Sequence, residues 1–262
     1  MKFLTLAFRM TLTAYCFAQF AIQVLWLGKQ VMPQIMRYQG QVSEKRKHAL
    51  FHAHKHVVIY LNTLTRLGLV SFRFVGTPIN EPSVIVANHP SLLDFIVLLK
   101  DFPNAVCLYK SKTRDNPILS NFVKVAGYIE GMDGTREASK RIINECCQRL
   151  DEGHHVIVFA EGTRSRSSVS IGRFHTTSFL AAFKSNCVVQ PVVIYCDPLF
   201  LGKKQSWTEF SRGRNRMVIE YQEPIRVAEL PKELRSTKGL VDHTRATIKK
   251  RLLELSVEEN SA

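Results

Sequence analysis

The chain carries a histidine and an aspartate five positions apart, directly after a short apolar run. Residues 84–87 are mostly β-branched and follow Pro82, which predicts a short buried strand. Pro90 and the apolar residues after it predict a helix over residues 91–100. We therefore expect His89 at the corner between strand and helix, and Asp94 in the first helical turn, where the helix dipole favours a negative charge.

Histidine and aspartate at this spacing can act together as a base. A carboxylate that accepts a proton from one imidazole nitrogen fixes the tautomer and leaves the other nitrogen free to take a proton from a hydroxyl group. The alternative is a histidine that caps the helix beside a solvated aspartate. Residues 88–94 alone leave both interpretations open.

A second stretch adds a possible anion site. Residues 156–160 form another apolar run, which predicts a buried strand that leads into Glu161-Gly162-Thr163-Arg164-Ser165-Arg166-Ser167. Guanidinium groups and backbone N–H groups bind phosphate well, and a glycine permits close approach of the ligand. Taken singly, this stretch could also be an ordinary polar loop.

Together the two stretches resemble the conserved blocks of the glycerolipid acyltransferase family, which includes the lysophosphatidate acyltransferases. Residues 88–94 (NHPSLLD) are similar to the first block and residues 159–167 (FAEGTRSRS) to the third. Residues 189–193 are similar to the fourth block, a strand that contains a proline, and residues 110–127 to the segment between the first two blocks. The resemblance spans roughly residues 70 to 225.

The resemblance implies acyl transfer from a thioester to the hydroxyl of a lysophospholipid, most directly 1-acylglycerol-3-phosphate. It implies His89 as the general base and Asp94 as its partner. It also implies a set of substrate-binding residues: Ser91, Glu161, Gly162, Thr163, Arg164 and Arg166. The acyl donor would be acyl-coenzyme A or acyl-acyl carrier protein, and we expect neither a metal nor another cofactor.

The second block departs from the family pattern. The family usually has an arginine shortly after the glycine of this block, but here Gly127 is followed by Glu130 and Asp133, and the next arginine is Arg136. This keeps other acceptors open, for example a lyso-aminolipid or a specialised polyene lipid. Water as acceptor would give an acyl-thioester hydrolase, and a membrane-bound binding protein without activity is a further class.

The composition favours a basic protein that meets an anionic surface. The formal net charge is +14 over 262 residues, and nucleic acid and anionic membrane are the usual partners of such a chain. No nucleic-acid-binding motif is recognisable, so we expect a membrane and no nucleic acid. The six cysteines lack metal-ligand or disulfide spacing and are expected to be reduced, and the alternating His52, His54 and His56 lack nearby thiol or acidic ligands.

The N-terminal region is expected to associate with the membrane. Residues 10–28 are apolar and nearly long enough to span a bilayer, and a basic segment follows over residues 29–56. A transmembrane anchor, an interfacial helix and a buried helix all fit, and we favour anchoring. The catalytic part is then expected on the cytoplasmic face of the inner (plasma) membrane. Residues 57–72 predict a further amphipathic helix.

The remaining pattern alternates strands and helices, which predicts an α/β fold with a mixed, largely parallel central sheet flanked by helices. The expected organisation is a membrane-association segment over 1–70, a catalytic domain over 71–256 and a frayed tail over 257–262. Further strands are expected near 72–75, 105–109, 188–195 and 217–221, and further helices near 117–125, 136–152, 174–184 and 238–256. Active sites of such sheets gather where strands end and helices begin, which is where His89 and Glu161 are expected.

Overall fold

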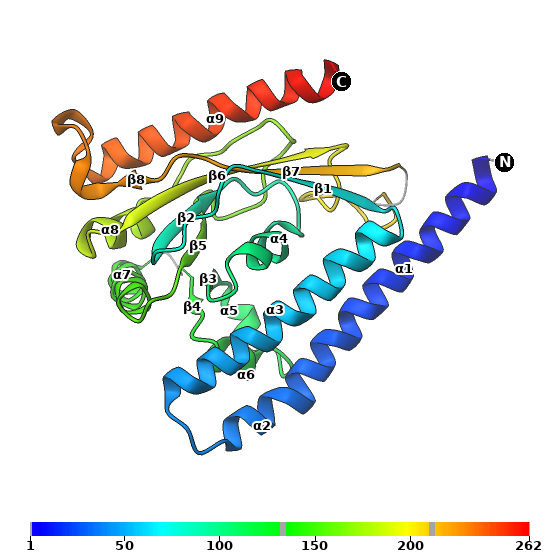
Figure 1. Cartoon of the computed structure of the whole chain (residues 1–262), viewed down its shortest axis with the longest axis horizontal. Coiled ribbons are helices and arrows are strands. Elements are labelled where there is room, and N and C mark those ends of the chain that lie inside the picture. The colour runs from blue at the N-terminus through cyan, green and yellow to red at the C-terminus, as the bar shows by residue number, and fades with distance from the viewer. Residues whose placement is uncertain (1, 132–134, 210–212, 262) are drawn as a thin grey trace.

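The computed structural model describes residues 2–131, 135–209 and 213–261, and within them the chain forms a central sheet flanked by helices (Figure 1). The sheet has the strand order β1-β7-β6-β2-β5-β3-β4, and β8 pairs with β6. The strands are β1 (Val70–Val75), β2 (Ser83–Ala87), β3 (Val106–Tyr109), β4 (Ile129–Glu130), β5 (Val156–Phe159), β6 (Val188–Asp197), β7 (Asn215–Tyr221) and β8 (Ile225–Arg226).

The sheet is mixed and largely parallel, which confirms the predicted fold class. Only the pairs that β6 makes with β7 and with β8 are antiparallel among the described strands. The two-residue strands β4 and β8 were not predicted, because two residues are too few to show an alternation of apolar and polar side chains.

The helices lie on both faces of the sheet. They are α1 (Lys2–Trp26), α2 (Met32–Arg37), α3 (Val42–Arg66), α4 (Asp94–Asp101), α5 (Ser111–Arg114), α6 (Ser120–Val125), α7 (Arg136–Asp151), α8 (Thr177–Lys184) and α9 (Thr237–Ser261). A π-helical turn, η1 (Leu27–Val31), joins α1 to α2, and the short 3₁₀ turns η3 (Val227–Glu229) and η4 (Lys232–Leu234) precede α9.

Successive strand residues face opposite layers of the core, as the pleat of a strand requires. Ile85 and Ala87 belong to a cluster with α3 and α4, whereas Val84 and Val86 belong to a second cluster with α7, α8 and α9. Every residue of β2 is buried. This explains why the strand is a continuous apolar run and not an alternating one.

The N-terminal helices form a hairpin in which α1 and α3 lie side by side (Figure 1). Helix α3 begins at Val42, much earlier than the predicted residue 57, and is capped by Gln41 and Glu44 in a capping box. It ends at Arg66, and residues 70–72, which were predicted as helix, pair with β7 as part of β1. That part of the prediction was wrong because pairing with a strand more than 140 residues away leaves no local signal.

The hairpin is also joined to the rest of the molecule. Cys16 of α1 and Tyr60 and Leu64 of α3 are buried in the same cluster as the strand residue Ile85. Gly28 lies in η1, where an added Cβ atom would come 2.4 Å from the carbonyl oxygen of Ile118. The helical segment that contains α1 is long and apolar enough over Leu6–Arg37 to cross a membrane, by length and composition.

The end of the chain differs from the expected frayed tail. Helix α9 continues to Ser261, past the expected end of the catalytic domain at residue 256. Glu258 is ion-paired with Arg251, and Glu259 is ion-paired with Arg73 and Arg216. The pair of Glu258 with Arg251 lies within α9, whereas the two pairs of Glu259 bind the last turn of the helix to β1 and β7.

Candidate active site

His89 lies between the end of β2 and the start of α4, as the sequence predicts. Its Nδ1 atom is 2.7 Å from Oδ2 of Asp94. Helix α4 begins at Asp94 itself and not at residue 91, so Pro90 stands before the helix. The backbone N–H of Ser91 donates to the same Oδ2 atom at 2.8 Å, which holds the turn between His89 and Asp94 in place.

The environment of Asp94 defines the protonation of the pair. Its side chain is completely buried, and burial raises its pKa to about 6, although the contacts with His89 and Ser91 act in the opposite direction. Above that pH the carboxylate is ionised and can only accept hydrogen bonds, so Nδ1 of His89 must be the donor. The Nε2 atom of the neutral ring then carries no proton and is available as a base.

The ring of His89 is held by a neighbouring strand. It stacks on Phe159, the last residue of β5, with 4.1 Å between ring centroids and an angle of 19° between the ring planes. The side chain of His89 is 19% exposed, whereas that of Asp94 is fully covered. The base is therefore reachable from solvent, and its partner is not.

The segment of residues 159–167 binds the backbone of His89 from the side of β5. Glu161, which is buried, accepts from the N–H of His89 at 3.3 Å, and the N–H of Ser165 donates to the carbonyl oxygen of His89 at 2.6 Å. The Glu161 carboxylate also accepts from the hydroxyl of Ser165 and from the N–H of Gly172, each at 2.7 Å. This carboxylate thus cross-links its own loop to the first block.

Asn88 connects the first block to β6, the strand of the fourth block. Its side-chain amide donates to the carbonyl oxygen of Ile194 and accepts from the N–H of Ile194, both at 2.8 Å. The residue is fully buried. The side chain therefore continues the pairing of β2 with β6 past the end of β2.

The guanidinium group of Arg164 is bound by a neighbouring turn at Leu201 and Gly202. Its Nη1 atom donates to the carbonyl oxygens of Leu201 and Gly202 at 2.7 and 3.0 Å. The carbonyl oxygen of Leu201 also accepts from the N–H of Leu92, so this turn is bound to the first and third blocks together. Thr163 and Arg166 are exposed.

A cleft of about 660 Å³ opens beside His89. It lies where β3 and β5 diverge after a pairing of two residues each. Leu108, Ile157 and Val158 give it apolar walls, and Lys110, Lys112 and His175 give it basic groups. Among the predicted site residues, His89 and Gly162 line this cleft, while Asp94, Ser91, Glu161, Thr163, Arg164 and Arg166 are not among its lining residues.

The second block lies at the outer edge of the sheet. Glu130 of β4 is bound by Arg114 at 3.0 and 3.2 Å, and its carbonyl oxygen accepts from Arg141 at 3.0 Å. Gly131, which follows Glu130, lines the cleft beside His89. Asp133 lies outside the described residues, and Arg136, which starts α7, is exposed and is not among the residues that line the cleft.

The structure also bears on the cysteines and on metal binding. All six cysteines are free, and all except Cys187 are buried, as expected for small core residues. Among the described residues, no group of three or more histidine, cysteine, aspartate or glutamate side chains could hold a metal ion, and His52, His54 and His56 form no such group.

Sequence reasoning missed three residues of this site: Asn88, Phe159 and His175. Asn88 and Phe159 stand inside the recognised blocks, so their position was a usable signal. His175 had no such signal, because it comes close to Gly162 only through the fold. Gly162 has a φ of +66°, and a Cβ atom added there would lie 3.3 Å from Nε2 of His175.

Comparison with known proteins gives the same family. A 1-acyl-sn-glycerol-3-phosphate acyltransferase of Helicobacter pylori (strain J99) is 24% identical over 151 residues, which cover 57% of this chain and 63% of the relative. One of Saccharomyces cerevisiae is 26% identical over 156 residues, which cover 58% of this chain and 50% of the relative. The chain thus spans less than two thirds of the length of these curated relatives.

A solved structure has the same fold. The crystal structure of the 1-acyl-sn-glycerophosphate (LPA) acyltransferase PlsC from Thermotoga maritima matches with a TM-score of 0.74 and 20% sequence identity, over 98% of both chains. A family model described as Acyltransferase matches residues 58–195. Because this match covers more than half of the 262 residues, the chain belongs to the acyltransferase family of enzymes.

Proposed function

We propose that the protein transfers a fatty acyl group from an acyl thioester to the free hydroxyl of 1-acylglycerol-3-phosphate, giving phosphatidate for phospholipid biosynthesis. The observation that carries the proposal is the hydrogen-bonded pair of His89 and Asp94, whose partly exposed member, His89, borders the cleft with apolar walls and basic groups. The printed names of both curated relatives, 1-acyl-sn-glycerol-3-phosphate acyltransferase, support this acceptor.

The reaction needs one base and no covalent enzyme intermediate. Nε2 of His89 takes the proton of the acceptor hydroxyl while the oxygen attacks the thioester carbonyl carbon. The new C–O ester bond forms, the C–S bond breaks, and the imidazolium returns the proton to the leaving thiolate. The ionised Asp94 stabilises the imidazolium during this step. The thioester is already activated, so the step uses neither a metal nor a resident cofactor.

The other predicted site residues divide into two roles in this proposal. Ser91, Glu161 and Arg164 hold the backbone around His89, as their hydrogen bonds to protein groups suggest. Gly162 provides room at the cleft, and Thr163 and Arg166, which are exposed, bind the acceptor phosphate. This differs from the family expectation that all four residues 161–164 bind the phosphate.

The cleft beside His89 suits an acyl chain next to an anionic group. Leu108, Ile157 and Val158 would contact the chain, because apolar walls shield it from water. Lys110, Lys112 and His175 would attract the anionic head group. These three basic groups would take the part that the family assigns to the missing arginine of the second block.

A second candidate is the same reaction with another lysolipid as acceptor. Two observations favour it. The described residues of the second block include no cation, and Nη1 of Arg164 is occupied by the carbonyl oxygens of Leu201 and Gly202. A lysolipid whose head group differs from a simple phosphate monoester, such as a lyso-aminolipid, would need fewer cations.

The substrates and the N-terminal helices support action at a membrane. The hairpin of α1 and α3 exposes large apolar side chains, among them Phe8, Ile22 and Trp26 on α1. Basic residues of the same region, Lys47 and Lys55, are exposed and would meet anionic lipid head groups. We propose that the catalytic part lies on the cytoplasmic face of the inner membrane.

The function can be tested with purified protein and a radiolabelled acyl thioester. Lysophosphatidate, other lysolipids and no acceptor would be compared, with His89→Ala alongside. We expect labelled phosphatidate from lysophosphatidate, and a loss of about 10²- to 10⁴-fold in the variant, which is the usual contribution of a general base. Product only from another lysolipid would favour the second candidate. Free acid without acceptor would indicate a hydrolase, and no turnover at all would contradict the proposal.

A further inference from the structure

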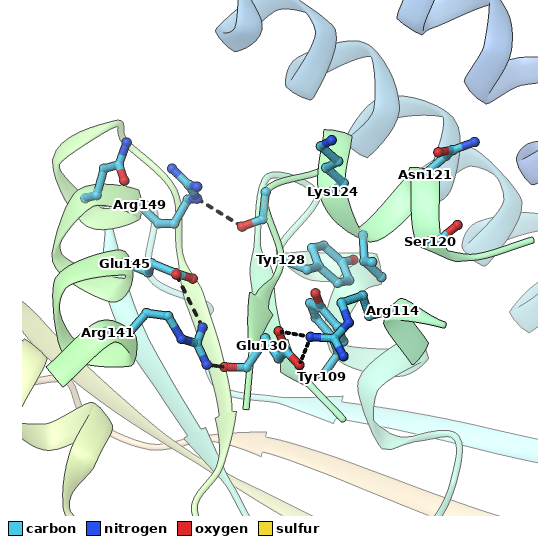
Figure 2. A pocket seen from close by; sticks show the side chains of 13 residues that line it. Tyr109, Arg114, Ser120, Asn121, Lys124, Tyr128, Glu130, Arg141, Glu145 and Arg149 are labelled. Atoms are coloured by element: carbon cyan, nitrogen blue, oxygen red, sulfur yellow. Dashed lines mark hydrogen bonds and ion pairs between the residues drawn. The ribbon is translucent and has the colours of Figure 1, made fainter. Parts of the chain in front are cut away.

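The arginines that line a second cavity of the molecule are ion-paired. This cavity, of about 550 Å³, is lined by residues of α6, β4 and α7, among others (Figure 2). Each arginine binds a carboxylate: Arg114 that of Glu130, Arg141 that of Glu145 and Arg149 that of Glu152. A paired cation adds little attraction for an anionic partner, so such a partner would be drawn to cations that are unpaired.

The loop between β6 and β7, residues 198–214, carries cations of the unpaired kind. Its sequence includes four basic residues and one acidic residue. Lys203, Lys204 and Arg214 are exposed, and none of the three makes a side-chain hydrogen bond or ion pair with the described parts of the chain. The β6–β7 loop therefore presents a positive surface that no ion pair within those parts neutralises.

Trp207 follows the two lysines in this loop and is 44% exposed. Its ring meets that of Phe17 in α1 edge-on, with 6.2 Å between the ring centroids and 69° between the ring planes. Its indole N–H has no hydrogen-bond partner among the residues that the structure describes. A tryptophan with an apolar ring and a free donor suits the boundary between lipid chains and head groups, where tryptophan is enriched.

The β6–β7 loop borders the exposed apolar face of α1. Arg9 donates to the carbonyl oxygen of Gly213, and Phe17, about two helical turns further on, contacts Trp207. Ala14 and Ala21 are exposed and stand three positions before and four positions after Phe17, so they are its neighbours on the helix surface. They form one apolar face with further exposed residues of α1, namely Tyr15, Ala18, Ile22 and Leu25.

Helix α3 borders the same face of α1 on its other side. Gln19 of α1 donates to the hydroxyl of Thr63 at 3.1 Å, and Trp26 lies edge-on to His56 with 5.2 Å between the ring centroids. Phe17 and Trp26 are nine positions apart, which places them on opposite sides of a helix that turns by about 100° per residue. The apolar face of α1 thus opens between α3 and the β6–β7 loop, and a membrane on that face would meet both.

The β6–β7 loop is also bound to the first block. The side chain of Gln205 closes the turn of residues 199–202 with two hydrogen bonds of 2.8 Å. In that turn the carbonyl oxygen of Leu201 accepts from the N–H of Leu92. Leu92 stands three residues after His89 and is itself 54% exposed. The position of the loop relative to the catalytic base is therefore fixed by hydrogen bonds.

We propose that residues 203–209 form a membrane contact of their own, in which the ring of Trp207 enters the head-group region and Lys203 and Lys204 bind anionic phospholipid. The inference rests on the proposed membrane association of α1 and adds a surface outside the N-terminal hairpin. The unpaired lysines select the partner, because an anionic leaflet attracts them and a neutral one does not. Since the loop is bound to the first block, this contact fixes how the active site faces the membrane.

The first test uses the two tryptophans of the chain as reporters. Trp26→Phe leaves Trp207 as the only tryptophan. The full-length variant is bound to vesicles of phosphatidylglycerol and phosphatidylcholine, made either from ordinary lipid or from lipid brominated near the head group. Bromine should quench most of the Trp207 emission, because the ring lies at that depth. An emission that bromine leaves unchanged would overturn the inference.

Trp207→Phe gives the matched measurement for Trp26, which is exposed on α1. Quenching of both tryptophans is the expected result. Quenching of Trp26 without quenching of Trp207 would show that the hairpin binds the membrane and the loop does not, so the inference would be wrong. Quenching of neither would contradict the inference together with the proposed membrane association of α1.

The second test removes the charge of the loop. Lys203→Gln with Lys204→Gln, combined with Trp26→Phe, should lower the ratio of docked to undocked loop, obtained from the quenching, about 25-fold, because each lysine near an anionic surface contributes a factor of about five. Lys249→Gln with Lys250→Gln, at exposed positions of α9, is the control and should match Trp26→Phe alone. Equal quenching in the two double variants, or equally strong quenching in vesicles of phosphatidylcholine alone, would show that the loop does not recognise anionic lipid.

Neither test needs turnover, so the inference and the proposed acyl transfer fail separately. If the protein turns over no acyl donor while bromine quenches Trp207, the acyl transfer fails and the membrane contact stands. If it acylates lysophosphatidate while bromine leaves Trp207 unchanged, the membrane contact alone is wrong.

Discussion

Nδ1 of His89 lies 2.7 Å from Oδ2 of Asp94, and the side chain of Asp94 is completely buried. Its second carboxylate oxygen, Oδ1, has no hydrogen-bond partner. A buried carboxylate with one unsatisfied oxygen is costly in its ionised form. The buried position of Asp94 therefore orients His89 for proton transfer and at the same time lowers the stability of the fold.

This relationship predicts opposite effects of Asp94→Asn on activity and stability. The pKa of Asp94 is raised from 3.8 to about 6, so its ionised form costs about 3 kcal/mol near neutral pH. The variant should lose about 10²- to 10⁴-fold in kcat. Its free energy of unfolding in urea at pH 7.5 should be equal to or above that of the wild type. A much less stable variant, or one that keeps its activity, would contradict this account.

Activity should fall as the pH drops through about 6. Asp94 becomes protonated there because burial raises its pKa to about 6, and a neutral carboxyl group can no longer stabilise the imidazolium of His89. The profile of kcat/KM between pH 5 and 8 checks this, with Asp94→Asn measured alongside. A wild-type profile that stays flat down to pH 5 would show that Asp94 does not become protonated between pH 5 and 8, which would contradict this prediction. Stability responds to pH in the opposite direction to activity. The folded chain holds the proton of Asp94 more tightly than the unfolded chain does, so the contribution of Asp94 to the free energy of unfolding decreases as the pH rises from 3.8 to about 6.

His155 should make the fold sensitive to acid. It directly precedes β5, is 4% exposed, and shares a hydrogen bond of 3.0 Å between its Nδ1 atom and Oγ of Ser83. Burial lowers its pKa from 6.5 to about 4. The unfolded chain therefore takes up a proton below pH 6.5 that the folded chain does not, and stability is lost as the pH falls from 6.5 towards 4.

The expected loss from His155 is about 3 kcal/mol over this range. Urea unfolding at pH 7.5 and pH 5 should show a smaller pH dependence for His155→Gln than for the wild type. His243→Gln, on α9, is the matched control and should leave the pH dependence unchanged. If the free energy of unfolding changes equally between pH 7.5 and pH 5 in the wild type and in His155→Gln, His155 is not the source of the acid sensitivity.

Asn88→Ala should destabilise the protein by about 2–4 kcal/mol, because two buried backbone groups of Ile194 lose their partners. The free energy of unfolding in urea measures this loss. Asn62→Ala, at an exposed position of α3, is the control and should change the free energy by less than about 0.5 kcal/mol. If the two variants are equally stable, the amide of Asn88 does not support the end of β2.

The sequence by itself determined the local parts of the site. The β-branched residues of β2 predict a buried strand, and the residues after Pro90 predict a helix. This places His89 and Asp94 on either side of one short turn, but the residues alone left open whether their side chains pair. The same reasoning located Glu161 after β5. These features depend on contacts within about ten residues, where side-chain type and spacing decide the conformation.

Only the tertiary structure decided how the blocks combine. Parallel pairing of β2 with β5 brings Glu161 and Ser165 to the backbone of His89, and the divergence of β3 from β5 opens the cleft. His175 lies beside Gly162 because its N–H donates to the carbonyl oxygen of Ala160, and Leu201, which follows β6, reaches Arg164 because β6 pairs with β2. Parallel strands pair across long connections, so no local pattern of side chains can specify which residues meet.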